Sequence, residues 1–377
     1  MKPTRSKRGS RIFQTLLLAF SLNLTTGHTT AEDLQPDTHS PFRFEVIWNN
    51  DGSVARPTIN TDRHYTNGLV LNLTHQPAWA QTLAESLSSL EPHAFAGNPP
   101  RSAVGYLLGH RIYTPVDIEI AAPLFNERPY AGYLYGGLYL QYDNLSPGLN
   151  PQPANDVATF THLELNLGLI GPSSGAESLQ TGVHDFIGAP DPLGWDNQLE
   201  DEAAVQAYAR RKWRFDLLDP PPAEALQSQR RWNAQLIPEF GLALGTVDIY
   251  AELALTARYG LHLPDDFGPP TLFNPRSATA VDQPRTPGWS FYVFARGTGR
   301  AVVHDVFIEG NVYQDSPFGV EEEPLIAFLE GGIVATYHRD NCALEFGYSL
   351  TTITDQFETQ STTDGFGQLF LALNWQY

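Results

Sequence analysis

The chain has 377 residues, a formal net charge of −19 and one cysteine, Cys342. A single cysteine excludes an intramolecular disulfide and a cysteine-based zinc site, and so acidic a chain is a poor partner for nucleic acid. Aromatic residues make up 12% of the chain, and Lys212 is the only lysine after the N-terminal segment. The acidity is compatible with divalent-cation binding, although it is more often a property of a solvated surface.

Residues 1–31 are predicted to be a cleaved signal peptide. The apolar run over 12–24 is shorter than the roughly 20 residues that a membrane-spanning helix needs, and Asn23, Thr25 and Thr26 interrupt it. Loss of this segment would take the formal charge from −19 to −24, because it carries five basic residues and no acidic one: Lys2, Arg5, Lys7, Arg8 and Arg11. We therefore expect an exported chain in which residues 32–377 form one domain.

Downstream of this segment, side chains alternate in character over stretches of about ten residues. Leucines recur at every second position in 69–73 and 163–169, and large apolar residues do so in 344–350. Alternation with a period of two places one set of side chains on one face of a sheet. The apolar face points inwards in a soluble sandwich and outwards to lipid in a membrane barrel.

The last strand favours the barrel. Leu369, Leu371, Leu373, Trp375 and Tyr377 alternate with Gln368, Phe370, Ala372, Asn374 and Gln376, and the sequence stops on an aromatic residue within the strand. Trp and Tyr suit the interfacial girdle of a membrane barrel, and the pattern resembles the terminal signal that outer-membrane barrels present to their assembly machinery. The predicted fold class is all-β, a transmembrane antiparallel β-barrel in the outer membrane.

Thirteen strands are predicted in chain order: 42–48, 65–75, 103–114, 130–142, 157–170, 204–216, 232–243, 247–260, 289–297, 303–313, 325–337, 341–352 and 366–377. Single-chain bacterial barrels have even strand counts, so one of these is false or another is missing. Three long connections interrupt them. Residues 76–102 have Leu83, Leu87 and Leu90 at helical spacing, residues 171–203 contain a predicted helix over 176–187, and 261–288 is predicted to be an irregular loop.

Two polar clusters lie near the first two strands: Asn49-Asn50-Asp51 and Thr61-Asp62-Arg63-His64-Tyr65-Thr66-Asn67-Gly68. One interpretation is a pair of hairpin turns, at Asn-Asp-Gly and at Asn67-Gly68. The other is a functional site. The oxygens of Asn50 and Asp51 are hard ligands that suit calcium, and the nearby hydroxyls and backbone N–H groups could stabilise an oxyanion.

His184 is a candidate general base on the predicted helix 176–187. Gln180 lies one turn before it on the same helix face, and neutral imidazole is suited to proton abstraction near neutral pH. The alternative for an isolated histidine is a surface or packed residue.

The segment Gly171-Pro172-Ser173-Ser174-Gly175 matches the G-x-S-x-G nucleophile elbow. That elbow belongs to a parallel α/β sheet, which the pattern of this chain does not predict. We interpret Ser173 instead as the N-cap of the helix that follows.

Taken in order, the motifs resemble those of the lipid A 3′-O-deacylase family of the outer membrane, over nearly all of the mature chain. They are the two clusters above, followed by these stretches: Arg128-Pro129-Tyr130-Ala131-Gly132, Gly168-Leu169-Ile170-Gly171-Pro172, Gln180 with His184, Gly194-Trp195-Asp196-Asn197-Gln198-Leu199, Leu263-Pro264-Asp265-Asp266-Phe267-Gly268 and Phe307-Ile308-Glu309-Gly310-Asn311.

The resemblance implies a twelve-stranded barrel that hydrolyses the 3′-acyloxyacyl ester of lipid A, the membrane anchor of lipopolysaccharide, with calcium (Ca2+) as cofactor. It implies a polar site of Asn50, Asp51, Thr66 and His184, with Gln180 in support and Asp51 and Asn50 as metal ligands. Two positions depart from the family. Pro190, followed by Asp191, stands where characterised deacylases have an acidic residue, and Thr246 stands where relatives commonly have Asn.

Two other functions are compatible with an outer-membrane barrel. A phospholipase barrel would use a Ser–His pair on its outer wall, and no matching serine is found. A porin or structural barrel would more often show repeated inward charges, without a helix that carries His and Gln.

Overall fold

The computed structural model describes residues 41–52, 62–90, 99–145, 157–218, 232–271, 287–339 and 342–375. The predicted signal peptide, residues 1–31, and the final Tyr377 lie outside these ranges.

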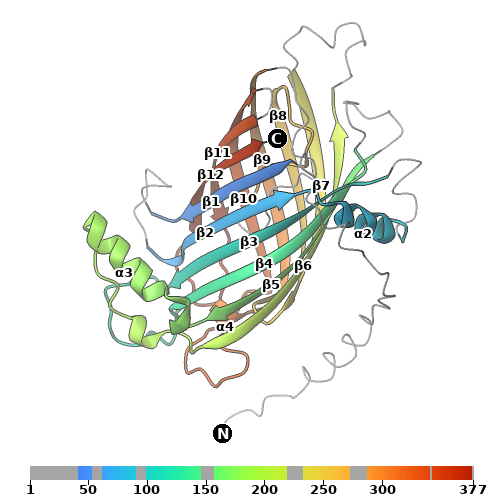
Figure 1. Ribbon diagram of the computed structural model, residues 1–377. Helices are drawn as coiled ribbons and strands as arrows, with labels where there is room; N and C mark the ends of the chain where they lie inside the picture. The colour runs from blue at the N-terminus through green and yellow to red at the C-terminus, as the bar shows by residue number, and fades with distance from the viewer. Residues whose placement is uncertain are drawn as a thin grey trace, which may run out of the picture. The chain divides into compact units, whose positions relative to one another are not determined.

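The described residues form one closed barrel of twelve antiparallel strands, tilted and joined in sequence order (Figure 1). The last strand closes on the first, since Phe42 pairs with Trp375 and Asn50 with Gly367. The strands are β1 (Phe42–Asn50), β2 (His64–His75), β3 (Arg101–Thr114), β4 (Ala131–Asp143), β5 (Ala158–Ile170), β6 (Glu202–Asp216), β7 (Trp232–Gly245), β8 (Asp248–Leu261), β9 (Gly288–Asp305), β10 (Leu325–Arg339), β11 (Cys342–Ile353) and β12 (Asp364–Trp375). The predicted barrel is confirmed.

One predicted strand was wrong. The predicted strands 289–297 and 303–313 both fall on the long strand β9 and on the short helix α4 (Val306–Glu309) that follows it. Gly297 and Gly299, near the gap between the two predicted strands, lie on the exposed side of β9, while Thr298 and Arg300 point inwards. The alternation therefore continues unbroken through the glycines.

The wall has an apolar outside and a polar inside. Leu165, Leu167 and Leu169 of β5 are exposed on one face, as are Leu371 and Leu373 of β12. The side chains between them point inwards and are buried. This is the polarity of a membrane barrel and the reverse of a soluble sandwich.

Paired charges and aromatic rings fill the interior. Arg300 contacts Glu252 at 2.7 Å, and Lys212 contacts Glu239 at 3.2 Å. Inward charges are thus repeated, as the porin alternative expected, but they are buried and neutralised by one another. In α4, Phe307 stacks on Tyr113 with ring centroids 4.1 Å apart. This stack lies at the end of the barrel where β1 finishes.

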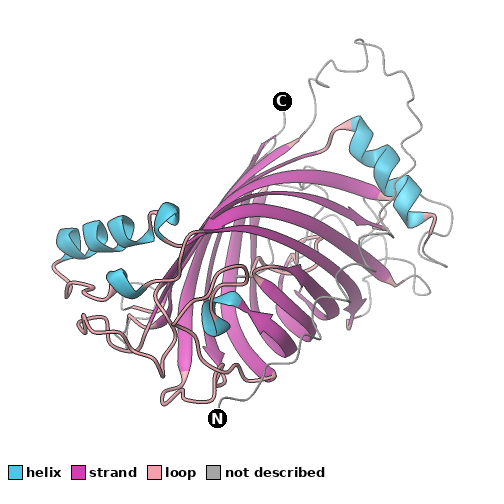
Figure 2. Cartoon of the chain, turned by 90° about the horizontal axis from the view of Figure 1, so that it is seen from below, coloured by secondary structure: helices cyan, strands magenta, loops and turns pink. Residues whose placement is uncertain are grey.

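Two longer helices lie outside the wall, at opposite ends of the strands (Figures 1 and 2). We call the end where β1 begins and β12 finishes the terminal end, and the other the loop end. Helix α2 (Ala78–Ser88) follows β2 at the terminal end, and α3 (Ala176–Ile187) follows β5 at the loop end. Both helices were predicted. Among the described residues, no helix has the length and apolar character needed to cross a membrane.

Candidate active site on the outer wall

Helix α3 begins against the outer face of β3 and β4. Ala176 packs with Ile112, Tyr130 and Trp195 in one buried cluster. Ile112 belongs to the outward set of β3, because Tyr106 and Leu108 of the same alternation are exposed. A Cβ atom at Gly132 would come within 2.0 Å of Ser174 Oγ and 2.3 Å of Ala176 Cβ. The missing side chain at position 132 is therefore what lets the helix approach the wall.

His184 lies on the face of α3 that is turned to the barrel and is 6% exposed. Its Nδ1 atom is 2.5 Å from the carbonyl oxygen of Pro190, and its Nε2 atom is 2.7 Å from Oδ2 of Asp62. A carbonyl oxygen can only accept, so Nδ1 carries a proton in this tautomer. Nε2 is then the nitrogen that can take up a further proton, beside a carboxylate that stabilises the charged ring.

Asp62 is the residue that sequence reasoning missed. Asp62 is part of the second polar cluster of the sequence, where no role was predicted for it. It lies in a loop far from α3 in sequence, yet it contacts the predicted site residues. Gln180 Nε2 donates to both carboxylate oxygens of Asp62, at 3.2 and 3.3 Å, and Thr66 also bonds to it. Burial raises the pKa of Asp62 above its usual value, and the contacts with His184, Gln180 and Thr66 partly offset this rise.

Gln180 thus acts on the histidine through Asp62. Its carbonyl oxygen accepts a hydrogen bond from Trp195 Nε1 at 2.8 Å, which fixes the orientation of the amide. The Gly-Trp-Asp-Asn motif of the sequence consequently has a structural task, because its tryptophan holds the glutamine that holds Asp62.

Asn50, Asp51 and Thr66 meet at the loop end of β1 and β2. Asn50 Nδ2 donates to the Thr66 carbonyl oxygen at 2.9 Å, and the Asp51 backbone N–H donates to the same oxygen at 3.3 Å. The pairing of β2 with β3 shifts register between Tyr65 and Asn67, so Thr66 sits in a bulge. Bulges of this kind re-aim a side chain, and the Thr66 hydroxyl lies 2.7 Å from that of Thr114.

The segment that carries Asp62 and Thr66 is fastened by His64. This residue has a left-handed φ of 59°, a conformation that costs energy for a residue with a side chain. Its Nδ1 is 2.7 Å from Asp364 and its Nε2 is 3.1 Å from Glu127. Asp364, at the start of β12, and Glu127, in the loop before β4, therefore hold the strained backbone beside the site.

The side-chain oxygens of Asn50 and Asp51 are of the type that a hard cation prefers as ligands. Asp51 supplies a carboxylate that also accepts the Arg63 N–H at 2.8 Å, and the Asn50 amide oxygen accepts the Gly52 N–H at 2.8 Å. No group of three or more His, Cys, Asp or Glu side chains that could hold a metal occurs within the described ranges. A calcium ion here would need Asn50 and Asp51 together with oxygens from water or substrate, which calcium accepts readily.

The comparisons with known proteins agree with this architecture. The family model described as Outer membrane protein LpxR matches residues 15–375. The chain belongs to this family. The solved structure of LpxR from Salmonella typhimurium aligns with a TM-score of 0.62 and 17% identity, over 89% of this chain and all of that one, and at this identity it shows the fold. The translocator domain of the autotransporter NalP from Neisseria meningitidis aligns over 98% of this chain and 95% of that one, at 8% identity and a TM-score of 0.43. No curated protein matches the chain in sequence.

Membership of the LpxR family confirms the resemblance drawn from the motifs and agrees with the predicted outer-membrane location. The structure shows what Pro190 and Thr246, the two residues that depart from the family pattern, contact in this chain. Pro190 lacks the acidic side chain, but its backbone carbonyl oxygen accepts a hydrogen bond from Nδ1–H of His184. Thr246 lies in the short turn between β7 and β8, where its hydroxyl accepts the Val205 N–H at 3.0 Å.

Ser173 is not the N-cap of α3. The cap position is Gly175, which has a left-handed φ of 73° and makes no side-chain cap bond. Ser173 instead lies in the preceding 3-10 turn and binds Asp201 through its N–H and its hydroxyl, both at 2.7 Å. Within the described residues, the hydrogen bonds of Ser173 go to Asp201 and none goes to His184, so Ser173 is not paired with the base as a nucleophile elbow requires.

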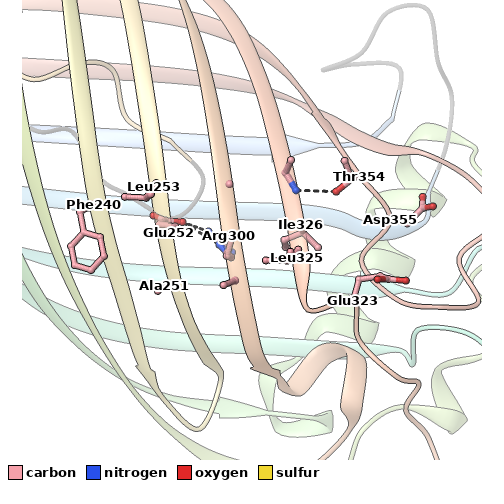
Figure 3. A pocket seen from close by; sticks show the side chains of 13 residues that line it. Phe240, Ala251, Glu252, Leu253, Arg300, Glu323, Leu325, Ile326, Thr354 and Asp355 are labelled. Atoms are coloured by element: carbon pink, nitrogen blue, oxygen red, sulfur yellow. Dashed lines mark hydrogen bonds and ion pairs between the residues drawn. The ribbon is translucent and has the colours of Figure 1, made fainter.

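A hollow of about 830 Å³ lies on a different part of the barrel, over β8, β9 and β10 (Figure 3). Its polar lining includes Glu252 and Arg300, which are bound to each other, and Glu323 and Asp355 at its edge. No histidine lines it. We therefore assign the chemistry to the wall under α3 in spite of the size of this hollow.

Proposed function

We propose that this LpxR family member is an esterase that removes the 3′-acyloxyacyl group of lipid A. The observation that carries the proposal is the His184–Asp62 pair on the outer wall, held by Gln180 and Trp195 in a member of this family. A general base on the outside of a membrane barrel is positioned for a lipid substrate rather than for a solute that passes through the lumen.

His184 acts as the general base. With Nδ1 donating to the Pro190 carbonyl oxygen, Nε2 is the ring nitrogen left to accept the proton of the attacking water. The water has to enter between Nε2 and Asp62, whose carboxylate then stabilises the imidazolium that results. Asp62 must be ionised for this role. Its hydrogen bonds from Gln180 and Thr66 favour the carboxylate against the effect of burial. The same pair then returns the proton to the departing alcohol oxygen of the sugar, as microscopic reversibility requires.

The negative charge that develops on the ester carbonyl oxygen needs donors close to the base. The Thr66 hydroxyl would supply one by turning its single proton from Asp62 to the substrate, since the Asp51 and Gly52 N–H groups already donate within the segment. Calcium, held by Asp51 and Asn50, would add electrostatic stabilisation of that charge.

Substrate access follows from the place of the site. The exposed leucines of β5 lead along the wall towards the start of α3, so acyl chains of a lipid can lie against the wall while the ester reaches His184. The interior offers no comparable route, because buried ion pairs occupy it.

Mass spectrometry of lipid A tests the proposal. Cells that express the wild-type chain should yield lipid A that lacks one acyloxyacyl group, and cells that express His184→Ala should yield the intact form. Both proteins should show the heat-modifiable gel migration of a folded barrel. Intact lipid A with the folded wild type would rule out the deacylase and leave the structural barrel. Release of fatty acid from glycerophospholipids alone would favour the phospholipase.

A further inference from the structure

Helix α2 is attached to the lipid-facing side of the barrel. Ala80 and Ala84 are fully buried against Val104 of β3 and Leu140 and Tyr142 of β4. These three residues belong to the outward sets of their strands, which continue as the exposed Tyr106, Leu108 and Leu138. Ser102 Oγ also donates to Gln81 Oε1 at 3.1 Å. The helix is thus fixed to the outside of the wall.

The helix lies at the level of an aromatic row at the terminal end. His75, the last residue of β2, stacks on Phe42 and on Tyr106, with ring centroids 5.8 and 5.6 Å apart, and Phe42 stacks on Trp375 at 5.8 Å. Rows of rings of this kind mark the membrane–water interface of a barrel. Since α2 starts three residues after His75, it begins at that interface.

Three different faces run along α2. One is buried and contains Ala80 and Ala84. Next to it lies an apolar stripe, in which Trp79 is 51% exposed, Leu83 is 40% exposed and the following Leu90 is 79% exposed. The remaining side is polar and exposed: Thr82, Glu85, Ser86 and Ser89. At 100° per residue, the stripe falls between the buried face and the polar face.

We propose that α2 is an interfacial anchor, whose apolar stripe lies among the acyl chains of the leaflet at the terminal end. The stripe lies beside the face of α2 that packs on the lipid-facing side of β3 and β4, and the polar side is left for water. This is the arrangement of an amphipathic helix in the plane of an interface. The partner is the hydrocarbon of the surrounding lipid, and the proposal is independent of the deacylase activity.

Site-specific fluorescence tests the anchor. Cys342, the free and exposed cysteine, is replaced by Ser, and single cysteines are introduced as Leu83→Cys in the stripe and Thr82→Cys on the polar side. Each is labelled with a polarity-sensitive nitrobenzoxadiazole probe, and the full chain is reconstituted into phosphatidylcholine vesicles. A second pair, Leu90→Cys and Ser89→Cys, repeats the comparison if one variant of the first pair fails to show heat-modifiable migration.

The stripe probe should emit at shorter wavelength than the polar-side probe. It should be quenched by vesicle lipids that carry a nitroxide on the acyl chain, and aqueous iodide should quench it several-fold less than its neighbour. Equal access of iodide to both probes would overturn the proposal. So would disulfide formation between two copies through Leu83→Cys together with loss of nitroxide quenching, because the occupant of the stripe would then be a second barrel.

Discussion

Helices α2 and α3 lie on the same two strands at opposite ends of the barrel, but they bury opposite kinds of side chain. Helix α2 turns Ala80 and Ala84 to the wall, where they pack in an apolar cluster. Helix α3 turns Gln180 and His184 to the wall, and both are bound to Asp62. Polar groups are rarely buried without a structural or functional need. The difference supports both proposals, that α3 holds the reactive groups and that α2 attaches the barrel to the membrane.

The largest expected effect on the rate of acyl release comes from a comparison of one buried polar residue on each helix, His184 on α3 and Ser88 on α2. His184→Ala should lower the rate of acyl release by about 10²–10⁴-fold, the usual loss for a general base. Ser88→Ala, the matched change on α2, should leave the rate unchanged, because its hydroxyl bonds only to the Glu85 carbonyl oxygen within the same helix. The rate is measured on purified lipid A in detergent micelles. Equal rates for His184→Ala and the wild type would move the base elsewhere.

Removal of divalent cations should abolish activity at the loop end of the barrel and leave the folding of the barrel unchanged. A chelator should abolish acyl release, and added calcium should restore it. Asp51→Ala should show the same loss without recovery on addition of calcium, while heat-modifiable migration stays unchanged. Full activity in excess chelator would exclude calcium from the reaction and leave the oxyanion to the protein donors.

The approach of α3 to the wall can be disturbed without replacing any residue of the polar site. Gly132→Ala would place its Cβ 2.3 Å from that of Ala176 and push the start of the helix outwards. A displacement of about 1 Å can cost on the order of 10²-fold in rate. Gly136→Ala on the same strand is the control, because its Cβ would meet nothing nearer than the Leu107 carbonyl oxygen at 3.8 Å. Similar rates for the two variants would show that the position of α3 is not critical.

Asp62→Asn should have a smaller effect that depends on pH. Loss of a charge-assisted hydrogen bond of about 1.5–3 kcal/mol corresponds to roughly 10- to 100-fold in rate. Because burial raises the pKa of Asp62, the wild type should lose activity on acidification at a higher pH than an exposed aspartate would cause. The pH profile of Asp62→Asn should lack this component of the acidic limb, and an unchanged profile would contradict the assigned role.

Ser173→Ala should have the smallest effect. Its hydroxyl bonds to Asp201 on the exposed side of the turn before α3, and one such bond contributes about 0.5–1.5 kcal/mol. Most activity should remain. An inactive variant accompanied by a covalent acyl-enzyme in the wild type would replace water attack by a serine nucleophile.

Local patterns in the sequence were enough for most of the fold. The helix over 176–187 was predicted with the bounds that the structure gives, because glycines stand on both sides of it. The alternation of leucines predicted the outward face of the wall. The error at β9 arose near Gly297 and Gly299, and only the pairing with β8 and β10 shows that the strand continues.

The site was less accessible from sequence because its bonds join distant segments. Gln180 and His184 share a helix face, which spacing reveals, but their common partner Asp62 precedes them by more than a hundred residues. Nor does any spacing rule reveal that the Pro190 carbonyl oxygen accepts a hydrogen bond from Nδ1–H of His184. The N-cap assigned to Ser173 failed for a local reason, since Gly175 adopts the left-handed conformation and the helix starts after it.

Placement of both helices on β3 and β4 gives the barrel a front and a back in the plane of the membrane. Under the proposed function, a lipid reaches His184 from the side of the barrel formed by β3 and β4. The strands on the other side carry no part of the proposed site. Under the proposed function, encounters with substrate are collisions in two dimensions, counted per unit of membrane area rather than per volume. The turnover in a crowded membrane would therefore depend on how freely the barrel spins about its own axis.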